Sequence, residues 1–221
     1  MNVMFDALIK VGGSVCHSPQ LKDYASRWVE LTHRYRLLFL AGGGLFADQV
    51  RAVDTYFELS DSAAHWMAIS AMDQSGYLLA DRLPGVRTVY DIDSANNLAA
   101  DGVSSVLIPS AMLRQHDPLP HSWDVTSDAL AAWLAGFAGV SRLILLKDVP
   151  GVYEADAPIS PPPLLAETTG KQLARFDIVD PFFVKSLPDR IECWIIDGRE
   201  PQRLAELLET GATTGTRVAE D

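Results

Sequence analysis

One short stretch near the start of the chain limits the fold more than any other: residues 7–14, with the sequence ALIKVGGS. Its first part is typical of a short apolar strand, and the two glycines that follow let backbone N–H groups approach a ligand closely. A lysine inside such a strand is costly to bury unless an anion neutralises it. Strand, Lys10 and glycine turn together predict a phosphate-binding site. The alternative is an ordinary strand-to-helix turn with a lysine at the strand end.

A second strand of the same kind follows. Residues 37–41 (LLFLA) run into Gly42, Gly43 and Gly44 and then into a helical pattern. Either glycine turn alone is explained well enough as a tight connection, but the pair favours one site that binds a polyphosphate. The sequences G-x-x-x-x-G-K-[ST] and G-x-G-x-x-G are both absent, so the phosphates must be bound by a different arrangement.

Strand and helix patterns alternate along the rest of the chain. Apolar runs predict strands at 86–90, 103–108, 143–146 and 191–196. Helical spacing predicts helices at 21–33, 45–57, 60–79, 94–100, 129–137, 164–176, 181–187 and 201–208. Loops are expected at 114–124 and 155–163, and a closing turn with an edge strand at 211–218. This alternation predicts an α/β protein, a three-layer α/β/α sandwich with a largely parallel central sheet.

Bulk composition excludes several classes of partner. The chain has 221 residues and a net charge of -11, which argues against binding to nucleic acid or to an anionic membrane. No apolar run reaches the roughly 20 residues of a membrane-spanning helix, and no secretory signal is expected. Cys16 and Cys193 follow no metal-ligand spacing. We therefore expect a cytoplasmic protein whose anionic ligands are bound by local lysines and backbone amides.

Several stretches resemble the amino acid kinase family, in that family's order along the chain. They are residues 9–14 (IKVGGS), 42–44 (GGG), 126–128 (TSD), 146–153 (LKDVPGVY), Lys185 and 215–216 (GT). The resemblance implies one kinase domain over 1–221, with an acceptor-binding lobe at about 1–125 and a nucleotide-binding lobe at about 126–221. It also implies ATP and Mg²⁺ as cofactors, a small-molecule phosphate acceptor and a homo-oligomer. We assign no metal-ligating side chain.

The resemblance assigns catalytic roles to Lys10, Asp128 and Lys185. Phosphoryl transfer depends mainly on positioning and on neutralising charge in the transition state. Lys10 is expected to bridge the transferred phosphoryl group and the nucleotide phosphates, and Lys185 to neutralise charge on the leaving side. Asp128 is expected to orient Lys10 and Lys185. The alternatives are a helix-start residue favoured by the helix dipole for Asp128 and a solvated helix residue for Lys185.

Nucleotide binding is expected from two segments. Gly12, Gly13 and Ser14 would supply amides to the phosphates, and Lys147, Asp148 and Tyr153 follow the strand at 143–146. Ligands of α/β proteins usually bind at the carboxyl ends of strands. The role of Lys147 stays open; we also expect it to neutralise an acceptor phosphate. Asp148 is alternatively a turn residue.

Acceptor binding is expected from Gly42, Gly43 and Gly44 and from Trp123 and Asp124, which lie in the stretch 121–128 (HSWDVTSD). The latter stretch, with residues 131–135 (AAWLA), resembles a branch of the family associated with methanofuran-type cofactor synthesis. That branch's kinase converts an aminomethylfuran-methyl phosphate to its diphosphate. Trp123 would then stack on the ring and Asp124 pair with the amine. Otherwise Trp123 packs the loop and Asp124 caps the helix.

Two other functions remain open at this point. The acceptor of a related kinase can be a carboxylate, a carbamate or a nucleoside monophosphate. A protein of another class, which binds a nucleotide or oxyanion without catalysis, could use the same fold. The presence of Lys10, Asp128 and Lys185 together favours an enzyme.

Overall fold

The structure is a computed structural model that describes residues 4–154 and 162–219. Its centre is one eight-stranded sheet in the order β3-β4-β2-β1-β5-β7-β8-β6. The strands are β1 Ala7–Val11, β2 Leu37–Ala41, β3 Arg87–Val89, β4 Ser105–Leu107, β5 Arg142–Lys147, β6 Glu167–Thr169, β7 Glu192–Asp197 and β8 Thr216–Ala219. All neighbouring pairs are parallel except β7 and β8. The predicted fold class is confirmed.

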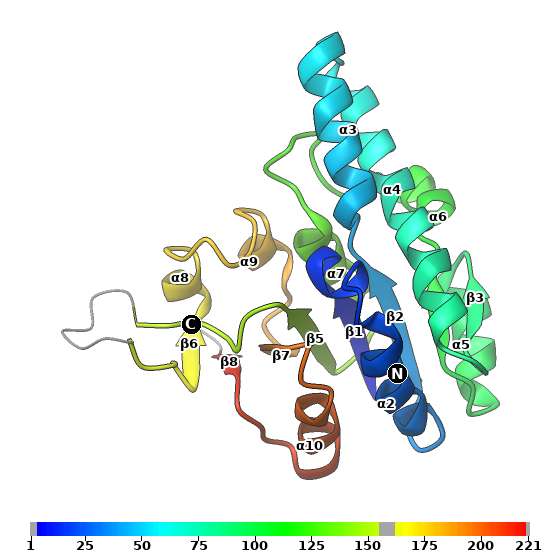
Figure 1. Cartoon of the computed structure of the whole chain (residues 1–221), viewed down its shortest axis with the longest axis vertical. Coiled ribbons are helices and arrows are strands. Elements are labelled where there is room, and N and C mark those ends of the chain that lie inside the picture. Colours follow the sequence, from blue (N-terminus) through cyan, green and yellow to red (C-terminus); the bar gives the residue numbers. More distant parts are fainter. Residues whose placement is uncertain (1–3, 155–161, 220–221) are drawn as a thin grey trace.

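Helices cover both faces of this sheet (Figure 1). They are α1 Gly13–Cys16, α2 Leu21–Thr32, α3 Gly44–Phe57, α4 Asp61–Arg82, α5 Ile92–Ala100, α6 Ser110–His116, α7 Ser127–Phe137, α8 Gly170–Leu173, α9 Phe183–Ser186 and α10 Gln202–Thr210. Side chains of α2 and α10 share one core with one face of the sheet, and those of α5, α6 and α7 share another core with the opposite face. The molecule therefore has the three layers that the alternating pattern predicts.

Alternation along the central strands decides which way the lysines point. In β1, Leu8 belongs to the core under α7, whereas Ile9 and Val11 belong to the core under α2. Successive side chains of a strand point to opposite faces, so Lys10 lies on the α7 face with Leu8. The same alternation in β5 places Lys147 on the α7 face, next to Leu145. Two lysines from different strands thus converge beneath the start of α7.

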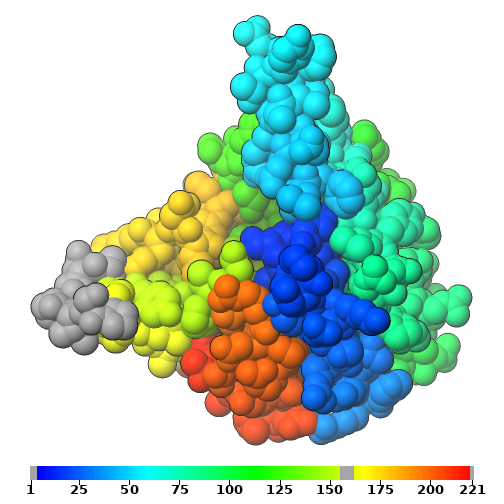
Figure 2. All heavy atoms as spheres, viewed as in Figure 1, coloured from blue at the N-terminus to red at the C-terminus, as the bar shows by residue number. Residues whose placement is uncertain are grey.

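Helices α3 and α4 form a long antiparallel hairpin that extends beyond the sheet (Figure 1). In the space-filling view the tip of α3 projects from the body as a ridge (Figure 2). Its last residues, Tyr56 and Phe57, are exposed. Ser60 begins α4 with a side-chain cap that accepts a hydrogen bond from the Ala63 N–H.

Three sequence-based expectations need correction. Part of the predicted loop at 114–124 is the end of α6, where Met112 and Leu113 are buried. The predicted helix at 164–176 contains strand β6 before the short helix α8, because residues 167–169 pair with β8 and α8 begins only after its N-cap at Thr169. The final strand β8 is not at the edge; it lies between β7 and β6. Most of the linker predicted at 155–163 lies outside the described residues.

Candidate active site

A buried ionic cluster lies at the carboxyl ends of β1 and β5. The Lys10 ammonium lies 2.8 Å from the Asp128 carboxylate, and both side chains are almost fully buried. Lys147 donates to the other carboxylate oxygen of Asp128 and, at 2.7 Å, to the Ile178 carbonyl. Asp128 therefore holds two lysines together. The sequence expectation named Lys10 and Lys185 as its partners, whereas the structure places Lys147 in the second position.

Burial and charge act in opposite directions on these groups. Burial lowers the pKa of Lys10, and the Asp128 carboxylate offsets part of that effect. Burial alone would raise the pKa of Asp128, but Lys10 and Lys147 hold that pKa below its ordinary value. The carboxylate is therefore ionised at neutral pH and keeps positive charge at the strand ends.

Asp128 is not the cap of its own helix. The side chain of Thr126 caps α7 by accepting from the Asp128 N–H. Thr126 in turn donates to Asp180 at 2.7 Å, and Asp180 also accepts from the Ala129 N–H and the Phe182 N–H. Asp180 was not identified from the sequence, because an aspartate before a proline is typical of an ordinary turn. Its carboxylate fixes the start of α7 and with it Asp128.

The two glycine turns pack directly against each other. A Cβ atom on Gly13 would lie 2.5 Å from the Gly44 Cα, closer than side-chain carbon atoms come to backbone. Gly44 itself has a φ of +51°, in the left-handed region that favours glycine. A Cβ on Gly42 would lie 3.5 Å from the Lys10 Cε. The two turns and Lys10 therefore form one continuous site, as expected from the pair of motifs.

His17 stabilises the second glycine turn through hydrogen bonds. Its Nδ1 accepts from the Leu45 N–H at 2.7 Å, and its Nε2 lies 3.3 Å from the Ser75 hydroxyl. Ser75 donates to the Gly43 carbonyl. Burial lowers the pKa of His17, although Asp48 opposes this effect, so the ring is neutral at pH 7 and can accept from Leu45. The sequence placed His17 only in a polar turn.

Two cavities meet at Gly13 and Ser14, which line both. The first, about 480 Å³, we name the lysine cavity. Its lining residues that were predicted from the sequence to bind a nucleotide or phosphate are Lys10, Gly12, Gly13, Ser14, Lys147, Asp148 and Tyr153. Lysine ammonium groups and bare backbone amides suit a polyphosphate with its magnesium ion. Asp148 and Asp177 are its exposed lining carboxylates.

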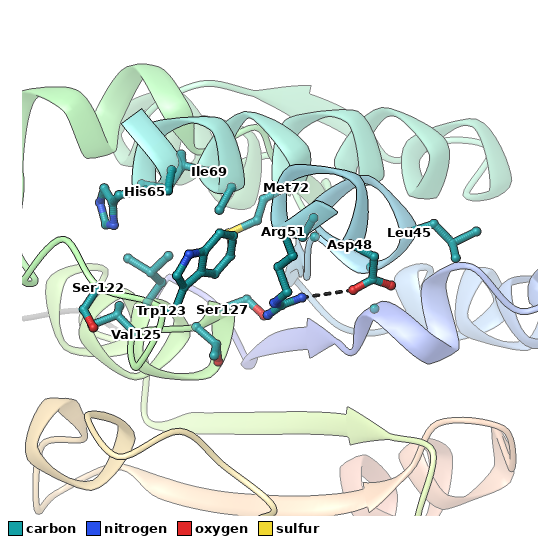
Figure 3. Close-up of a pocket in the computed structure, with 18 of the residues that line it drawn as sticks. Leu45, Asp48, Arg51, His65, Ile69, Met72, Ser122, Trp123, Val125 and Ser127 are labelled. Carbon is teal, nitrogen blue, oxygen red and sulfur yellow. Dashed lines mark hydrogen bonds and ion pairs between the residues drawn. The ribbon is translucent and has the colours of Figure 1, made fainter. Parts of the chain in front are cut away.

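The second cavity, about 460 Å³, we name the tryptophan cavity. Gly43 and Gly44 line it, together with faces of α3 and α4 and the segment 122–127. Trp123 lies across it, with the Arg51 guanidinium 4.9 Å from the ring centre (Figure 3). The Trp123 indole donates to Asp54 at 2.6 Å, and Arg51 is paired with Asp48 at 3.0 Å. The cavity is thus aromatic and charged, and it shares Gly13 and Ser14 with the lysine cavity.

Besides the buried Asp128, three predicted site residues line neither cavity. Gly42 lies behind the turn, next to Lys10. Asp124 is exposed, and its backbone N–H donates to Ser122. Lys185 is exposed on α9, with its ammonium 5.6 Å from the centre of the Phe182 ring. Lys147 lines the lysine cavity and is not part of the lining of the tryptophan cavity.

A group of possible metal ligands lies at one end of the tryptophan cavity. Ligand atoms of His65, Asp117 and His121 lie within 4.8 Å of one another. The two imidazole rings are stacked, however, with centres 4.2 Å apart and planes at 18°. Nitrogen lone pairs lie in the plane of their rings, so nearly parallel rings do not point both at one ion. We assign no metal to this group.

The family comparison matches most of the chain. The model of the amino acid kinase family matches residues 7–178. The [5-(aminomethyl)furan-3-yl]methyl phosphate kinase of Methanocaldococcus jannaschii is 28% identical over 218 residues, covering 96% of each chain. The uridylate kinase of Methanospirillum hungatei is 26% identical, covering 96% of this chain and 93% of its own length.

A solved structure agrees with the fold. The uridylate kinase from Archaeoglobus fulgidus superimposes with a TM-score of 0.76 and 20% identity, covering 97% of this chain and 100% of its own. Along the described residues, no helix combines the length and apolarity needed to cross a membrane. Both cysteines are free and buried.

Proposed function

The chain belongs to the amino acid kinase family and is a phosphotransferase, and from that premise we propose the identity of its acceptor. Membership implies ATP as the phosphoryl donor. The proposed acceptor is a phosphomonoester, [5-(aminomethyl)furan-3-yl]methyl phosphate, which becomes its diphosphate in methanofuran-type C1-cofactor biosynthesis.

The observation that carries this proposal is the meeting of the two cavities at Gly13 and Ser14. The lysine cavity has the cations and amides for the phosphates of ATP. The tryptophan cavity has an aromatic face for a flat ring, at Trp123. A phosphate of the acceptor placed at the shared glycine turn would face the γ-phosphate of ATP. The relative from Methanocaldococcus jannaschii, matched over almost its whole length, has the same acceptor in its name.

The chemistry follows from this placement. An oxygen of the acceptor phosphate attacks the γ-phosphorus of ATP and forms a new P–O bond. The bond from that phosphorus to the oxygen bridging it to the β-phosphate breaks, and ADP leaves. Lys10 neutralises charge on the transferring group, and Asp128 keeps the Lys10 ammonium in place. Mg²⁺ would be held mainly by the ATP phosphates, with Asp148 and Asp177 as the carboxylates that could bind its water ligands.

The test is an acceptor screen with ATP and Mg²⁺. The acceptors are [5-(aminomethyl)furan-3-yl]methyl phosphate, uridylate, isopentenyl phosphate and acetylglutamate, and ADP and the phosphorylated product are measured separately. We expect the highest kcat/KM with the furan phosphate. Preferred turnover of uridylate, the substrate named for two of the similar kinases, would overturn the acceptor and leave the kinase assignment intact. ATP binding without turnover of any acceptor would favour the non-catalytic alternative.

A further inference from the structure

The tryptophan cavity has two ends of different chemistry (Figure 3). Leu45 and Asp48 lie toward one end, and His65 and Ser122 toward the other. The glycine turns supply amides, but no side-chain charge, to the part that meets the lysine cavity. Arg51 is already paired with Asp48 and lies over Trp123. An acceptor whose phosphate lies at the glycine turns therefore presents its other substituent to the end near His65.

One face of α4 forms the wall at this end. Asp61, Ala64, His65, Ala68, Ile69 and Met72 all line the cavity. Asp61 and His65 are four residues apart, so their side chains lie on the same side of the helix. The small side chains of Ala64 and Ala68 leave room beside them. Asp61 lies in the first turn of α4.

Neither side chain makes a hydrogen bond or an ion pair with another residue in the part of the chain that the structure describes. His65 is only 8% exposed, yet its ring nitrogens have no hydrogen bond to any residue that the structure describes. Its ring stacks on His121, which is occupied by Ser62 and Asp117. Asp61 is exposed at the start of α4, and within the same described ranges its carboxylate has neither an ion pair nor a hydrogen bond, so it is free to meet a ligand. Because His65 lines the cavity, a ligand or water in the cavity can supply the hydrogen bond that no described residue gives its ring.

We propose that Asp61 and His65 form the binding site for a primary ammonium group of the acceptor. The proposal rests on the proposed function and deepens it, since it assigns the amine of the aminomethyl substituent to this end of the cavity. Asp61 supplies the negative charge, and a ring nitrogen of His65 accepts one N–H of the ammonium group. Burial and the neighbouring His121 lower the pKa of His65, which keeps the ring neutral and able to accept. Asp124, which the sequence suggested for this role, lines no part of the cavity.

The experiment compares two acceptors and three carboxylate variants. The acceptors are [5-(aminomethyl)furan-3-yl]methyl phosphate and the analogue with a methyl group in place of the aminomethyl group. The variants are Asp61→Asn, with Asp48→Asn and Asp124→Asn as matched controls. Asp48 lines the same cavity toward the opposite end, and Asp124 lies outside it. Melting temperatures of all variants check that each is folded.

A charge-assisted hydrogen bond contributes about 1.5–3 kcal/mol, or roughly 10- to 100-fold in binding. We expect Asp61→Asn to raise KM for the aminomethyl acceptor by about that factor, with little change in kcat. The same variant should leave KM for the methyl analogue nearly unchanged, so that the wild-type preference for the amine disappears. Asp48→Asn and Asp124→Asn should keep that preference. His65→Phe should weaken it, and His65→Gln, which retains an acceptor, should restore part of it.

Two results would overturn the ammonium site. In the first, the wild type uses both furan phosphates equally well; this leaves the furan phosphate kinase in place and removes the site. In the second, Asp61→Asn lowers kcat/KM for both acceptors by the same factor, which indicates a structural role for Asp61. A wild type that uses neither furan phosphate, but turns over another acceptor of the screen, would overturn the proposed function as well.

Discussion

The lysine cavity and the tryptophan cavity are adjacent, but the chain builds them in different ways. The lysine cavity consists of strand ends, backbone amides and two lysines fixed by one buried carboxylate. The tryptophan cavity is lined mostly by side chains from the faces of α3 and α4 and from one loop. The need to bind a polyphosphate restricts the residues of the lysine cavity to a few short sequence motifs. A small-molecule acceptor sets no such restriction on the tryptophan cavity, so the side chains that line it can vary while the fold stays the same.

The sharpest test of this difference is Lys10→Ala. Because Lys10 lies in the lysine cavity, the change should reduce kcat by about 100-fold or more with every acceptor that the enzyme uses. The reason is the loss of a fixed positive charge on the transferring group. Steady-state kinetics with two acceptors measures this, and Lys22→Ala, an exposed lysine of α2, is the control. Near-normal turnover by a folded Lys10→Ala protein would falsify the assignment of the catalytic lysine.

The second prediction concerns Asp128→Asn, which keeps the shape of the side chain and removes its charge. Without that charge the Lys10 pKa should fall further, because burial already lowers it and Asp128 opposes the effect. The protonated form of Lys10 is then lost at a lower pH. We expect the alkaline limb of the kcat/KM profile to shift to lower pH, and kcat/KM at neutral pH to fall by about tenfold or more.

The same variant should also unfold more easily. Removing one partner of a buried ionic cluster costs up to about 3–5 kcal/mol, because the remaining charges are left uncompensated. Asp197→Asn is the matched control: Asp197 is a buried carboxylate at the end of the neighbouring strand β7, paired with Arg199. It should lower stability without moving the alkaline limb. An unchanged pH profile for Asp128→Asn would show that Asp128 supports the fold and not the lysine.

The fold was largely predictable because its signals are local. Inside the buried strands β1, β2, β5 and β7 every residue except Lys10 is apolar, and each strand is followed by glycine or aspartate, which is typical of a parallel sheet. The exceptions are short elements held by tertiary contacts. Strand β6 has only three residues and pairs with β8, about fifty positions later in the chain. Such a pairing leaves no periodic pattern in a single sequence.

The two cavities also differ in how many of their lining residues could be identified from the sequence. Every residue that the sequence assigned to nucleotide binding lines the lysine cavity. In the tryptophan cavity, the sequence indicated Gly43, Gly44 and Trp123, but it missed Arg51, Asp61 and His65. These three lie on helices whose apolar spacing explains the fold by itself, so their polar positions look like ordinary helix surface. Only the packing of α3 against α4 shows that they line a cavity.

The third prediction tests the acceptor side directly. If Trp123 provides a stacking face, Trp123→Ala should raise KM for the furan phosphate up to about tenfold, while the Kd for ATP measured alone stays nearly constant. Trp123→Phe keeps an aromatic face but removes the indole N–H that donates to Asp54, so it separates stacking from packing of the loop. Equal losses in the two variants, together with a lower melting temperature, would indicate that Trp123 only packs the loop.

The smallest expected effect concerns His17, which holds the second glycine turn in place through hydrogen bonds to the Leu45 N–H and to Ser75. Its pKa in the folded protein is lowered from the ordinary value of 6.5, so the unfolded chain binds a proton more readily. The stability that depends on neutral His17 is therefore complete above about pH 6.5 and is lost as the pH falls below that value. Protonation would also remove the Nδ1 lone pair that accepts from the Leu45 N–H.

We therefore expect the melting temperature of the wild type to fall between pH 7.5 and pH 5.5, and to fall less in His17→Asn. His65 has a lowered pKa as well and acts in the same direction, so the variant should reduce the pH dependence without abolishing it. His33→Asn, at an exposed histidine after α2, is the control and should behave like the wild type. Since the second glycine turn packs against Gly13, which lines both cavities, KM for ATP and KM for the acceptor should rise together in His17→Asn. A change confined to one substrate would mean that His17 serves one cavity and not the junction between them.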